Sequence, residues 1–315
     1  MKKIITALVV LLVVVGGFFA FTSGKHSDST GKSTSSDSKM SLKELNVQFV
    51  PSTNAETMLA KAKPLENLLS KKLGIPVHVS VATSYNTAVE AMGSKKVDMG
   101  FLPPDSYVTA QKQYGVKAIL QSTKLAMKDN NTGETTDKVV NTYKSMIIVK
   151  SNSPIKSIED LKGKKIATQS AISTSGYLFP VVELYKKGIN VVKDSTLVQV
   201  KGHDQGVMSV LNGDTDAAFI YDDVRTNVKK DQPDVFKDTR VIYYSNPIPN
   251  DTISLRKGIT ASDANKIQKA MIELAQTDEG KKALADGYSW QGVTEAKESS
   301  FDNVRQYEET ITKIK

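Results

Sequence analysis

The stretch "KKIATQSAISTSGYLFPVVELYKKG", residues 164–188, holds a strand, a loop and a helix in that order. "KKIAT" is typical of a short strand, and "YLFPVVELYKKG" has apolar residues at helical spacing. Between them lies a run of small residues, Ser173, Thr174, Ser175 and Gly176, at the expected start of the helix. The stretch therefore predicts one strand–loop–helix unit whose loop is rich in hydrogen-bond donors.

The alternation of strands and helices continues on both sides of this unit. Strand-like runs occupy residues 45–51, 76–82, 97–103, 116–124, 143–154, 195–202 and 215–222. Helical spacing occupies residues 54–74, 84–96, 104–115, 204–214 and 301–314, and a further helix begins at 261. This alternation indicates an α/β fold with doubly wound, mostly parallel sheets. Because roughly 270 residues follow the N-terminal region, we expect two such sheets rather than one.

The composition excludes several classes of protein. The chain has 315 residues, a formal net charge of +8 and no block of Lys and Arg, so we expect no nucleic-acid partner. The absence of cysteine excludes disulfides, zinc–thiolate sites, cysteine nucleophiles and a lipid anchor attached to cysteine. The histidines, His26, His78 and His203, lack metal-ligand spacing, and we expect neither a metal nor a cofactor.

The N-terminus predicts export. Two lysines precede an apolar run over residues 4–21, which is typical of a signal peptide or a membrane anchor. We assign residues 1–22 to this segment and residues 23–40 to a disordered Ser/Thr/Lys linker. The rest of the chain is then expected outside the cytoplasmic membrane, secreted or tethered by the apolar run; whether that run is cleaved stays open.

Parallel sheets bind ligands at the carboxyl ends of their strands, so the strand-to-helix loops are the candidate sites. These loops lie at residues 84–85, 103–106, 173–176 and 222–223. The loop at 173–176 is the most informative, because free N–H groups at a helix start favour anions and hydroxyls add further donors. The alternative is ordinary capping of the helix, which needs a single serine.

Five segments in one order resemble a known family. They are "VDMGFLPPDSYV" at 97–108, "YKSMIIVKSNSPI" at 143–155, "STSGYLFP" at 173–180, "GHDQGVMSV" at 202–210 and "NPIPNDTISLRKGI" at 246–259. Together they resemble the phosphonate/phosphite/phosphate-binding proteins of ABC importers, within the type 2 periplasmic binding protein superfamily. The resemblance implies a two-lobed fold with a hinge of two crossover segments, near 141–152 and 241–253. Lobe 1 would comprise residues 41–148 and 246–315, and lobe 2 residues 149–245.

The resemblance also implies which residues hold a phosphorus oxyanion. The hydroxyls of Ser173, Thr174 and Ser175 would bind it at the helix start, where Gly176 lets the backbone approach closely. His203 would donate a hydrogen bond to the same oxygens; the alternative is a capping or surface histidine. Tyr85 and Tyr143 match family tyrosines whose hydroxyls reach the oxyanion, although a half-buried tyrosine that only packs is an equal alternative. The prolines at 103–104 replace polar groups of many relatives, so that loop is expected to shape the cleft.

Two acids extend the implied site. Asp223 and Asp251 match family positions that hold an ammonium group, which would favour an aminoalkylphosphonate such as 2-aminoethylphosphonate. Asp222 would replace Asp223 if the register is shifted by one. The alternatives are acids solvated in loops, or an ion pair between Asp251 and Arg256.

The resemblance implies a binding function and no enzymatic activity. The protein would be the substrate-binding component of an ABC importer, closing on its ligand by a hinge motion and delivering it to a membrane permease driven by an ATPase. Two alternatives remain: a two-lobed sensor or binding protein for another small anionic metabolite, and a serine hydrolase using Ser173 or Ser175 with His203 and Asp204. No nucleophile-elbow motif supports the hydrolase.

Overall fold

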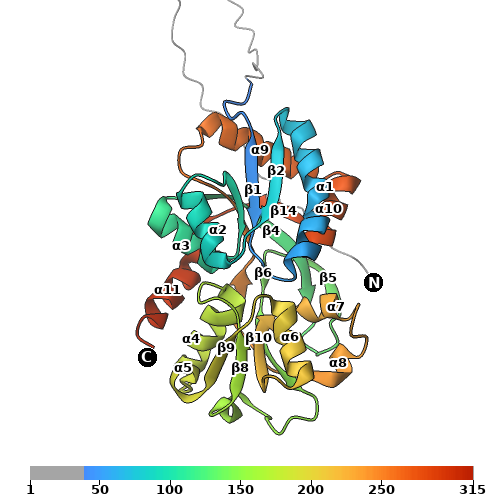
Figure 1. The fold of residues 1–315 in the computed structure, drawn as a ribbon, viewed down its shortest axis with the longest axis vertical. Helices are drawn as coiled ribbons and strands as arrows, with labels where there is room; N and C mark the ends of the chain where they lie inside the picture. The colour runs from blue at the N-terminus through green and yellow to red at the C-terminus, as the bar shows by residue number, and fades with distance from the viewer. Residues whose placement is uncertain (1–38, 315) are drawn as a thin grey trace, which may run out of the picture. The chain divides into compact units, whose positions relative to one another are not determined.

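The computed structural model describes residues 39–314. The predicted export segment and all but the last residues of the predicted linker lie outside this range. Within the range, none of the helices has the length and apolar composition needed to cross a membrane. Residues from Met40 onward form one compact unit that contains two lobes, each built on its own sheet (Figure 1).

The sheet of the first lobe combines parallel and antiparallel strands. Its order is β14 (Gly292–Glu295), β4 (Lys117–Met127), β13 (Thr252–Leu255), β3 (Met99–Leu102), β1 (Leu45–Phe49) and β2 (Val77–Val81), with β5 (Thr135–Val140) paired to β4. Strand β1 is parallel to both β2 and β3, whereas β13, β14 and β5 are antiparallel to their neighbours. The strands at the centre of this sheet are the most buried: every residue of β3 and β13 is buried, whereas no residue of β5 or β14 is.

The second lobe has the same mixed character. Its sheet runs in the order β11 (Thr239–Tyr244), β7 (Ser145–Lys150), β10 (Ala217–Tyr221), β8 (Lys165–Thr168) and β9 (Thr196–Gln199). Strand β8 is parallel to β9 and β10, and β7 is antiparallel to β10 and β11. The alternation of strands and helices predicted mostly parallel sheets. Both sheets are mixed. The strands that flank the lobe crossings, β5 and β7 on one side and β11 and β13 on the other, are antiparallel to their neighbours.

Helices cover both sheets (Figure 1). The first lobe carries α1 (Ala55–Leu73), α2 (Tyr85–Gly93), α3 (Pro104–Tyr114), α9 (Ala261–Leu274) and α10 (Asp278–Tyr288). The second carries α4 (Phe179–Lys186), α5 (Val191–Asp194), α6 (His203–Asn212), α7 (Val224–Val228) and α8 (Val235–Asp238), together with η1 (Ile158–Leu161), a 3₁₀ turn, and η2 (Thr174–Leu178), a π-helical turn. The two-lobed α/β fold predicted from the sequence is confirmed.

The chain crosses between the lobes through a short pair of antiparallel strands. Strand β6 (Thr142–Tyr143) pairs with β12 (Ile248–Pro249), so the outgoing and returning crossings are hydrogen-bonded to each other. Both lie within the two linking segments expected at 141–152 and 241–253. The expected lobe boundary after residue 148 falls inside β7, and every residue of β7 belongs to the second sheet.

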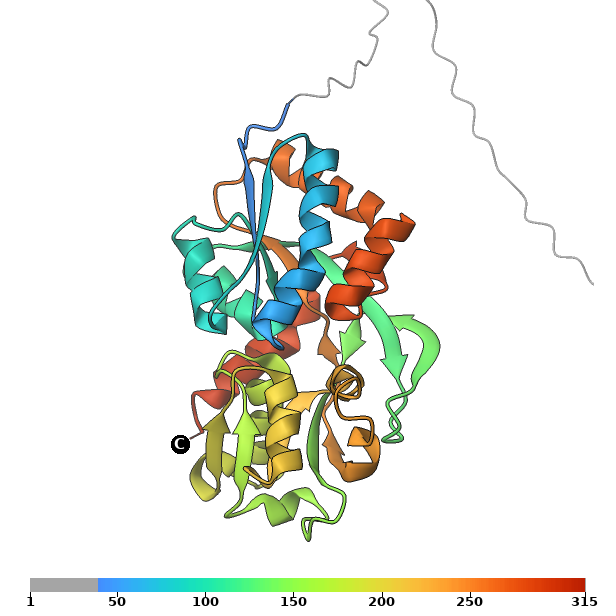
Figure 2. The ribbon, with the colours of Figure 1, turned by 45° about the vertical axis from the view of Figure 1, so that its right-hand side comes forward.

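Two further elements join the lobes. Helix α11 (Asp302–Ile311), which follows a 3₁₀ turn, η3 (Glu298–Phe301), packs against α3 of the first lobe and α4 of the second. Residues 246–315 therefore do not all belong to one lobe. The β4–β5 hairpin extends beside the second lobe (Figure 2), and there Asn131 accepts a hydrogen bond from the backbone N–H of Val241 in β11.

Candidate ligand-binding cleft

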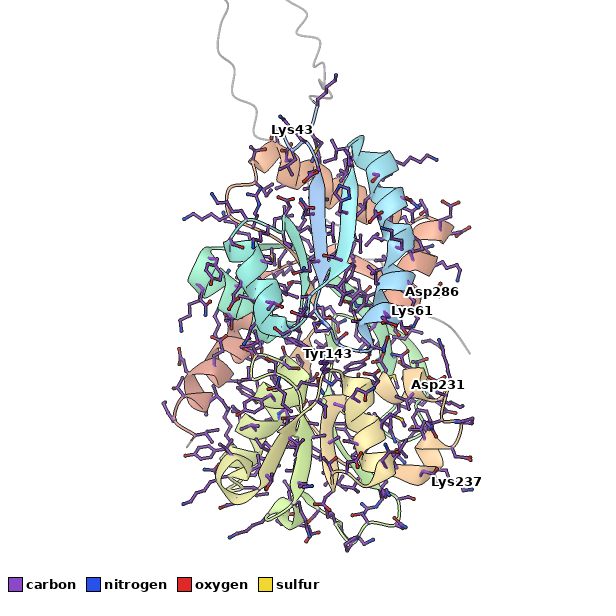
Figure 3. All side chains as sticks on the ribbon, viewed as in Figure 1. Lys43, Lys61, Tyr143, Asp231, Lys237 and Asp286 are labelled. Carbon is purple, nitrogen blue, oxygen red and sulfur yellow. The ribbon has the colours of Figure 1, made fainter. Side chains whose placement is uncertain are left out.

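A cleft of about 600 Å³ lies between the lobes. The first lobe contributes the β1–α1 loop, Tyr85, Lys124, Asp251 and the end of α10, and the second contributes the start of η2, the start of α6 and the end of β10. Tyr143 lies where the two lobes meet (Figure 3). The cleft therefore forms at the ends of strands from both sheets, next to the paired crossings.

The structure brings most of the predicted site residues together. Those that line the cleft are Tyr85, Tyr143, Ser173, Ser175, His203, Asp223 and Asp251. Thr174 and Gly176 lie outside the lining. We refer to Tyr85, Tyr143, Ser173, Ser175 and His203 as the hydroxyl–imidazole cluster, and to Lys124, Asp222, Asp223 and Asp251 as the acid cluster.

The loop before η2 is held in place by hydrogen bonds of its own. The Ser173 side chain caps the turn by accepting the N–H of Gly176 at 3.3 Å. The Ser173 carbonyl accepts from Tyr177 and Leu178, which gives the wide π-type turn. Pro180 has no N–H to donate back into this turn, and the Ser175 carbonyl instead accepts the Ser145 hydroxyl at 2.6 Å. The hydroxyls of Ser173 and Ser175 are thereby presented on a fixed backbone.

The two tyrosines of the hydroxyl–imidazole cluster keep their protons. Ser84 caps α2 in a capping box with Thr87, which places Tyr85 at the first helical position and buries it. Burial raises the pKa of Tyr85, while a hydrogen bond with the Ser173 side chain acts in the opposite direction. Burial likewise raises the pKa of Tyr143, and the Asp251 carboxylate adds to that effect. Both side chains are therefore hydroxyl donors at any physiological pH.

His203 is a buried, neutral imidazole. It is 2% exposed, and burial lowers its pKa to about 3. Its ring packs on Tyr221 with the centroids 4.7 Å apart. Within residues 39–314 the Nδ1 atom has no hydrogen-bond partner. The imidazole therefore has a nitrogen available, and among the described residues no carboxylate accepts a hydrogen bond from Nδ1, as the His of a hydrolase triad would require.

The acid cluster contains a cation that the sequence patterns did not single out. Lys124 Nζ lies 2.8 Å from Asp223 Oδ2 and 3.4 Å from Asp222 Oδ1. Burial alone would lower the pKa of Lys124, but Asp223 and Asp222 outweigh it and raise that pKa. Asp222 also accepts the backbone N–H of Lys144 at 2.9 Å and lies outside the cleft lining, whereas Asp223 belongs to that lining.

Asp251 is the remaining carboxyl group of the acid cluster. Burial raises its pKa to about 6, an effect that the nearby Lys124 opposes. The alternative pairing with Arg256 is not formed, because Arg256 binds Asp98 at 2.8 Å. Asp251 therefore faces the cleft as a weakly acidic carboxyl group.

Thr174 and Gly176 make contacts outside the cleft that explain their residue types. The Thr174 hydroxyl accepts the backbone N–H of Asp105 from α3 at 2.9 Å, which joins the two lobes and directs this hydroxyl away from the cleft. A Cβ at position 176 would lie 2.3 Å from the Gln169 Cγ, so glycine is needed there for packing. In this structure the side chain of Thr174 and the Cα of Gly176 therefore contact neighbouring elements rather than the cleft.

The lobes are in contact on several sides of the cleft. His203 donates its backbone N–H to the Ser52 carbonyl at 2.9 Å, and Asn54 donates its backbone N–H to Asp204 Oδ2 at 3.2 Å. The Lys124–Asp223 ion pair and the Asp105–Thr174 hydrogen bond make two further connections. Since each connection joins opposite lobes, the structure represents a closed form.

Comparison with known proteins identifies the family of this chain. A family model described as "ABC transporter, phosphonate, periplasmic substrate-binding protein" matches residues 47–301. The chain belongs to this family. The resemblance noted from the five sequence segments is thereby confirmed, and the protein is of the substrate-binding class of transporter components.

Relatives of this binding protein have related names. The phosphonates-binding periplasmic protein of Escherichia coli is 25% identical over 252 residues, covering 79% of this chain and 71% of that protein. The phosphate-import protein PhnD of Mycolicibacterium smegmatis is 26% identical over 283 residues, covering 83% of this chain and 84% of that protein. Among solved structures, PhnD1 of Prochlorococcus marinus in complex with methylphosphonate superimposes with a TM-score of 0.74 at 20% identity, covering 86% of this chain and 99% of that one.

Several lining residues of this binding protein escaped the sequence patterns. Ser52, Thr53 and Asn54 follow β1, so the rule that ligands bind beyond strand ends would have found them. Lys124 gave no such signal, because it lies within a long strand that runs antiparallel to its neighbours. Tyr288, at the end of α10, comes from a helix that the sequence did not predict separately.

Proposed function

We propose that this protein captures phosphonates, or the related anions phosphite and phosphate, for an ABC importer. The observation that carries the proposal is the hydroxyl–imidazole cluster: five side chains from both lobes, all neutral, face one cleft. A phosphonate loses its water on burial and needs a hydrogen bond for each oxygen lone pair it exposes. Hydroxyl and imidazole donors supply these bonds without requiring an accompanying buried charge.

The proposed mechanism is closure of the two lobes around the anion. In an open form, the anion first meets the serines of the second lobe, whose backbone is already fixed by Ser145. Closure then adds Tyr85 from the first lobe and Tyr143 from the crossing. The ligand stabilises the closed form because it contacts both lobes only there. A membrane permease and an ATPase would complete the importer, and the predicted export segment would place this component outside the cytoplasmic membrane.

Isothermal titration calorimetry of the purified protein tests the proposal. We expect methylphosphonate, phosphite or phosphate to bind with a dissociation constant of about 1 μM or lower, which corresponds to about 8 kcal/mol. Sulfate serves as a control anion of similar size. If none of the three phosphorus anions releases or absorbs heat at protein concentrations well above that constant, and none raises the melting temperature, the proposal is wrong.

A further inference from the structure

Lys124 is a charged side chain of the first lobe that reaches acids of the second. It lies on β4, whereas Asp222 and Asp223 follow β10. Its side chain is 11% exposed, and its Nζ lies 5.8 Å from the centre of the Tyr143 ring. Lys124, Asp223 and Tyr143 all line the cleft. A protein ammonium group therefore occupies the part of the cleft where the acid cluster would receive a ligand's ammonium group.

The position of Lys124 changes what the acid cluster attracts. Asp223 Oδ2 is in direct contact with Nζ, and Asp222 is shared between Nζ and the backbone N–H of Lys144. A second ammonium group brought beside Asp223 would lie within a few ångströms of Nζ. Two like charges this close repel each other strongly at the effective dielectric constant of a protein site. The acid cluster is thus partly neutralised from within the chain.

We propose that Lys124 is a specificity-determining residue, which makes the cleft prefer phosphonates with an uncharged carbon substituent over aminoalkylphosphonates. The inference rests on the proposed function, because it concerns the ligand of the same cleft. It reverses the expectation that Asp223 and Asp251 serve a zwitterionic ligand. Asp251 also lines the cleft, but Lys124 acts on it as well.

A matched pair of ligands tests this without any mutation. Ethylphosphonate and 2-aminoethylphosphonate differ by one amino group. We expect the unmodified protein to bind ethylphosphonate at least about tenfold more tightly in calorimetry. Equal affinities, or tighter binding of 2-aminoethylphosphonate, would overturn the inference while leaving the proposed function intact. If neither ligand nor methylphosphonate, phosphite or phosphate binds, it is the proposed function that fails.

Substitution of the lysine tests the cause. Lys124→Met keeps the length of the side chain and removes its charge, so the preference should move toward 2-aminoethylphosphonate by at least about tenfold. The double variant Lys124→Met/Asp223→Asn removes both partners and avoids leaving Asp223 buried without a cation. In this variant the change in the ratio of the two affinities should be smaller. Lys128→Met is the control, since Lys128 lies outside the cleft, is half exposed and pairs with Glu134. This variant should prefer ethylphosphonate over 2-aminoethylphosphonate to the same extent as the unmodified protein.

The two variants also separate selectivity from folding. Far-ultraviolet circular dichroism and thermal denaturation establish that each variant is folded before its affinities are compared. A folded Lys124→Met protein with an unchanged ratio of the two affinities would overturn the role of Lys124. If Lys124→Met does not fold, the double variant decides: its preference for ethylphosphonate must be weaker than that of the unmodified protein, and an equal preference overturns the inference.

Discussion

The hydroxyl–imidazole cluster and the acid cluster share one cleft but handle charge in different ways. The first uses buried groups that stay neutral: tyrosines with raised pKa values and a histidine with a lowered one. The second pairs opposite charges, with the ammonium group of Lys124 between the carboxylates of Asp222 and Asp223. Burying neutral donors costs less than burying charges, and each donor becomes useful when an anion arrives. Under the proposed function, attraction of the anion and exclusion of other ligands would be carried by separate groups.

The largest expected effect comes from removing two donors of the hydroxyl–imidazole cluster. The double variant Ser173→Ala/Ser175→Ala loses two hydrogen bonds to a charged ligand, so we expect phosphonate affinity to fall about a thousandfold. Calorimetry with methylphosphonate measures the loss. Ser195→Ala is the control, because its hydroxyl bonds the Leu161 carbonyl away from the cleft. A loss below about fivefold in the double variant would show that these hydroxyls do not hold the anion.

The second prediction concerns the acid cluster and the pH dependence of stability. The pKa of Asp251 is raised from 3.8 to about 6 in the folded protein, so the folded state holds this proton more tightly than the unfolded state does. The contribution is therefore favourable below pH 3.8 and is lost as the pH rises to about 6. Over that range it would lower the free energy of unfolding by up to about 3 kcal/mol.

Asp251→Asn removes this dependence. Chemical denaturation of both proteins should be carried out between pH 3.8 and about 6. As the pH rises, the free energy of unfolding of the unmodified protein should fall relative to that of the variant. The comparison must be made without phosphorus anions, which titrate themselves. Parallel curves for the two proteins would mean that Asp251 has an ordinary pKa.

A third prediction returns to the hydroxyl–imidazole cluster. His203→Ala should weaken phosphonate binding about thirtyfold, and His203→Gln, which keeps an N–H donor, should lose less. Because the pKa of His203 is about 3, the ratio of affinities between the unmodified protein and His203→Ala should stay constant from about pH 5 to about pH 8. A ratio that changes across this range would show that the imidazole is charged.

The smallest expected effect lies outside both clusters. Tyr307 on α11 donates a hydrogen bond to Glu183 Oε1 of α4 at 3.1 Å, and Tyr243 donates to Oε2 of the same carboxylate. Tyr307→Phe should lower the free energy of unfolding by about 1 kcal/mol and leave phosphonate affinity unchanged. Denaturation and calorimetry measure the two quantities. A loss of affinity larger than the loss of stability would connect α11 to the cleft.

The sequence predicted the parts of the molecule that follow local rules. Periodicity identified β1 and α1, and the helix ends at Gly74 in the left-handed conformation that glycine favours. The donor-rich start of η2 was predicted from residue types at a helix N-terminus. The hydrogen bond between the Thr174 hydroxyl and the backbone of Asp105 could not be predicted, because it depends on how the two lobes meet. Lys124 was missed for the same reason: its acids lie about a hundred residues away along the chain, and no periodicity reports such a distance.

Helix α11 packs on α3 and α4, on elements of both lobes, and it contributes no residue to the cleft lining. For the proposed hinge motion we therefore expect a swing that widens the entrance of the cleft while the surfaces beside α11 scarcely separate. The distance between spin labels placed on opposite sides of the entrance should then change the most on ligand binding. The distance between labels placed beside this helix should scarcely change.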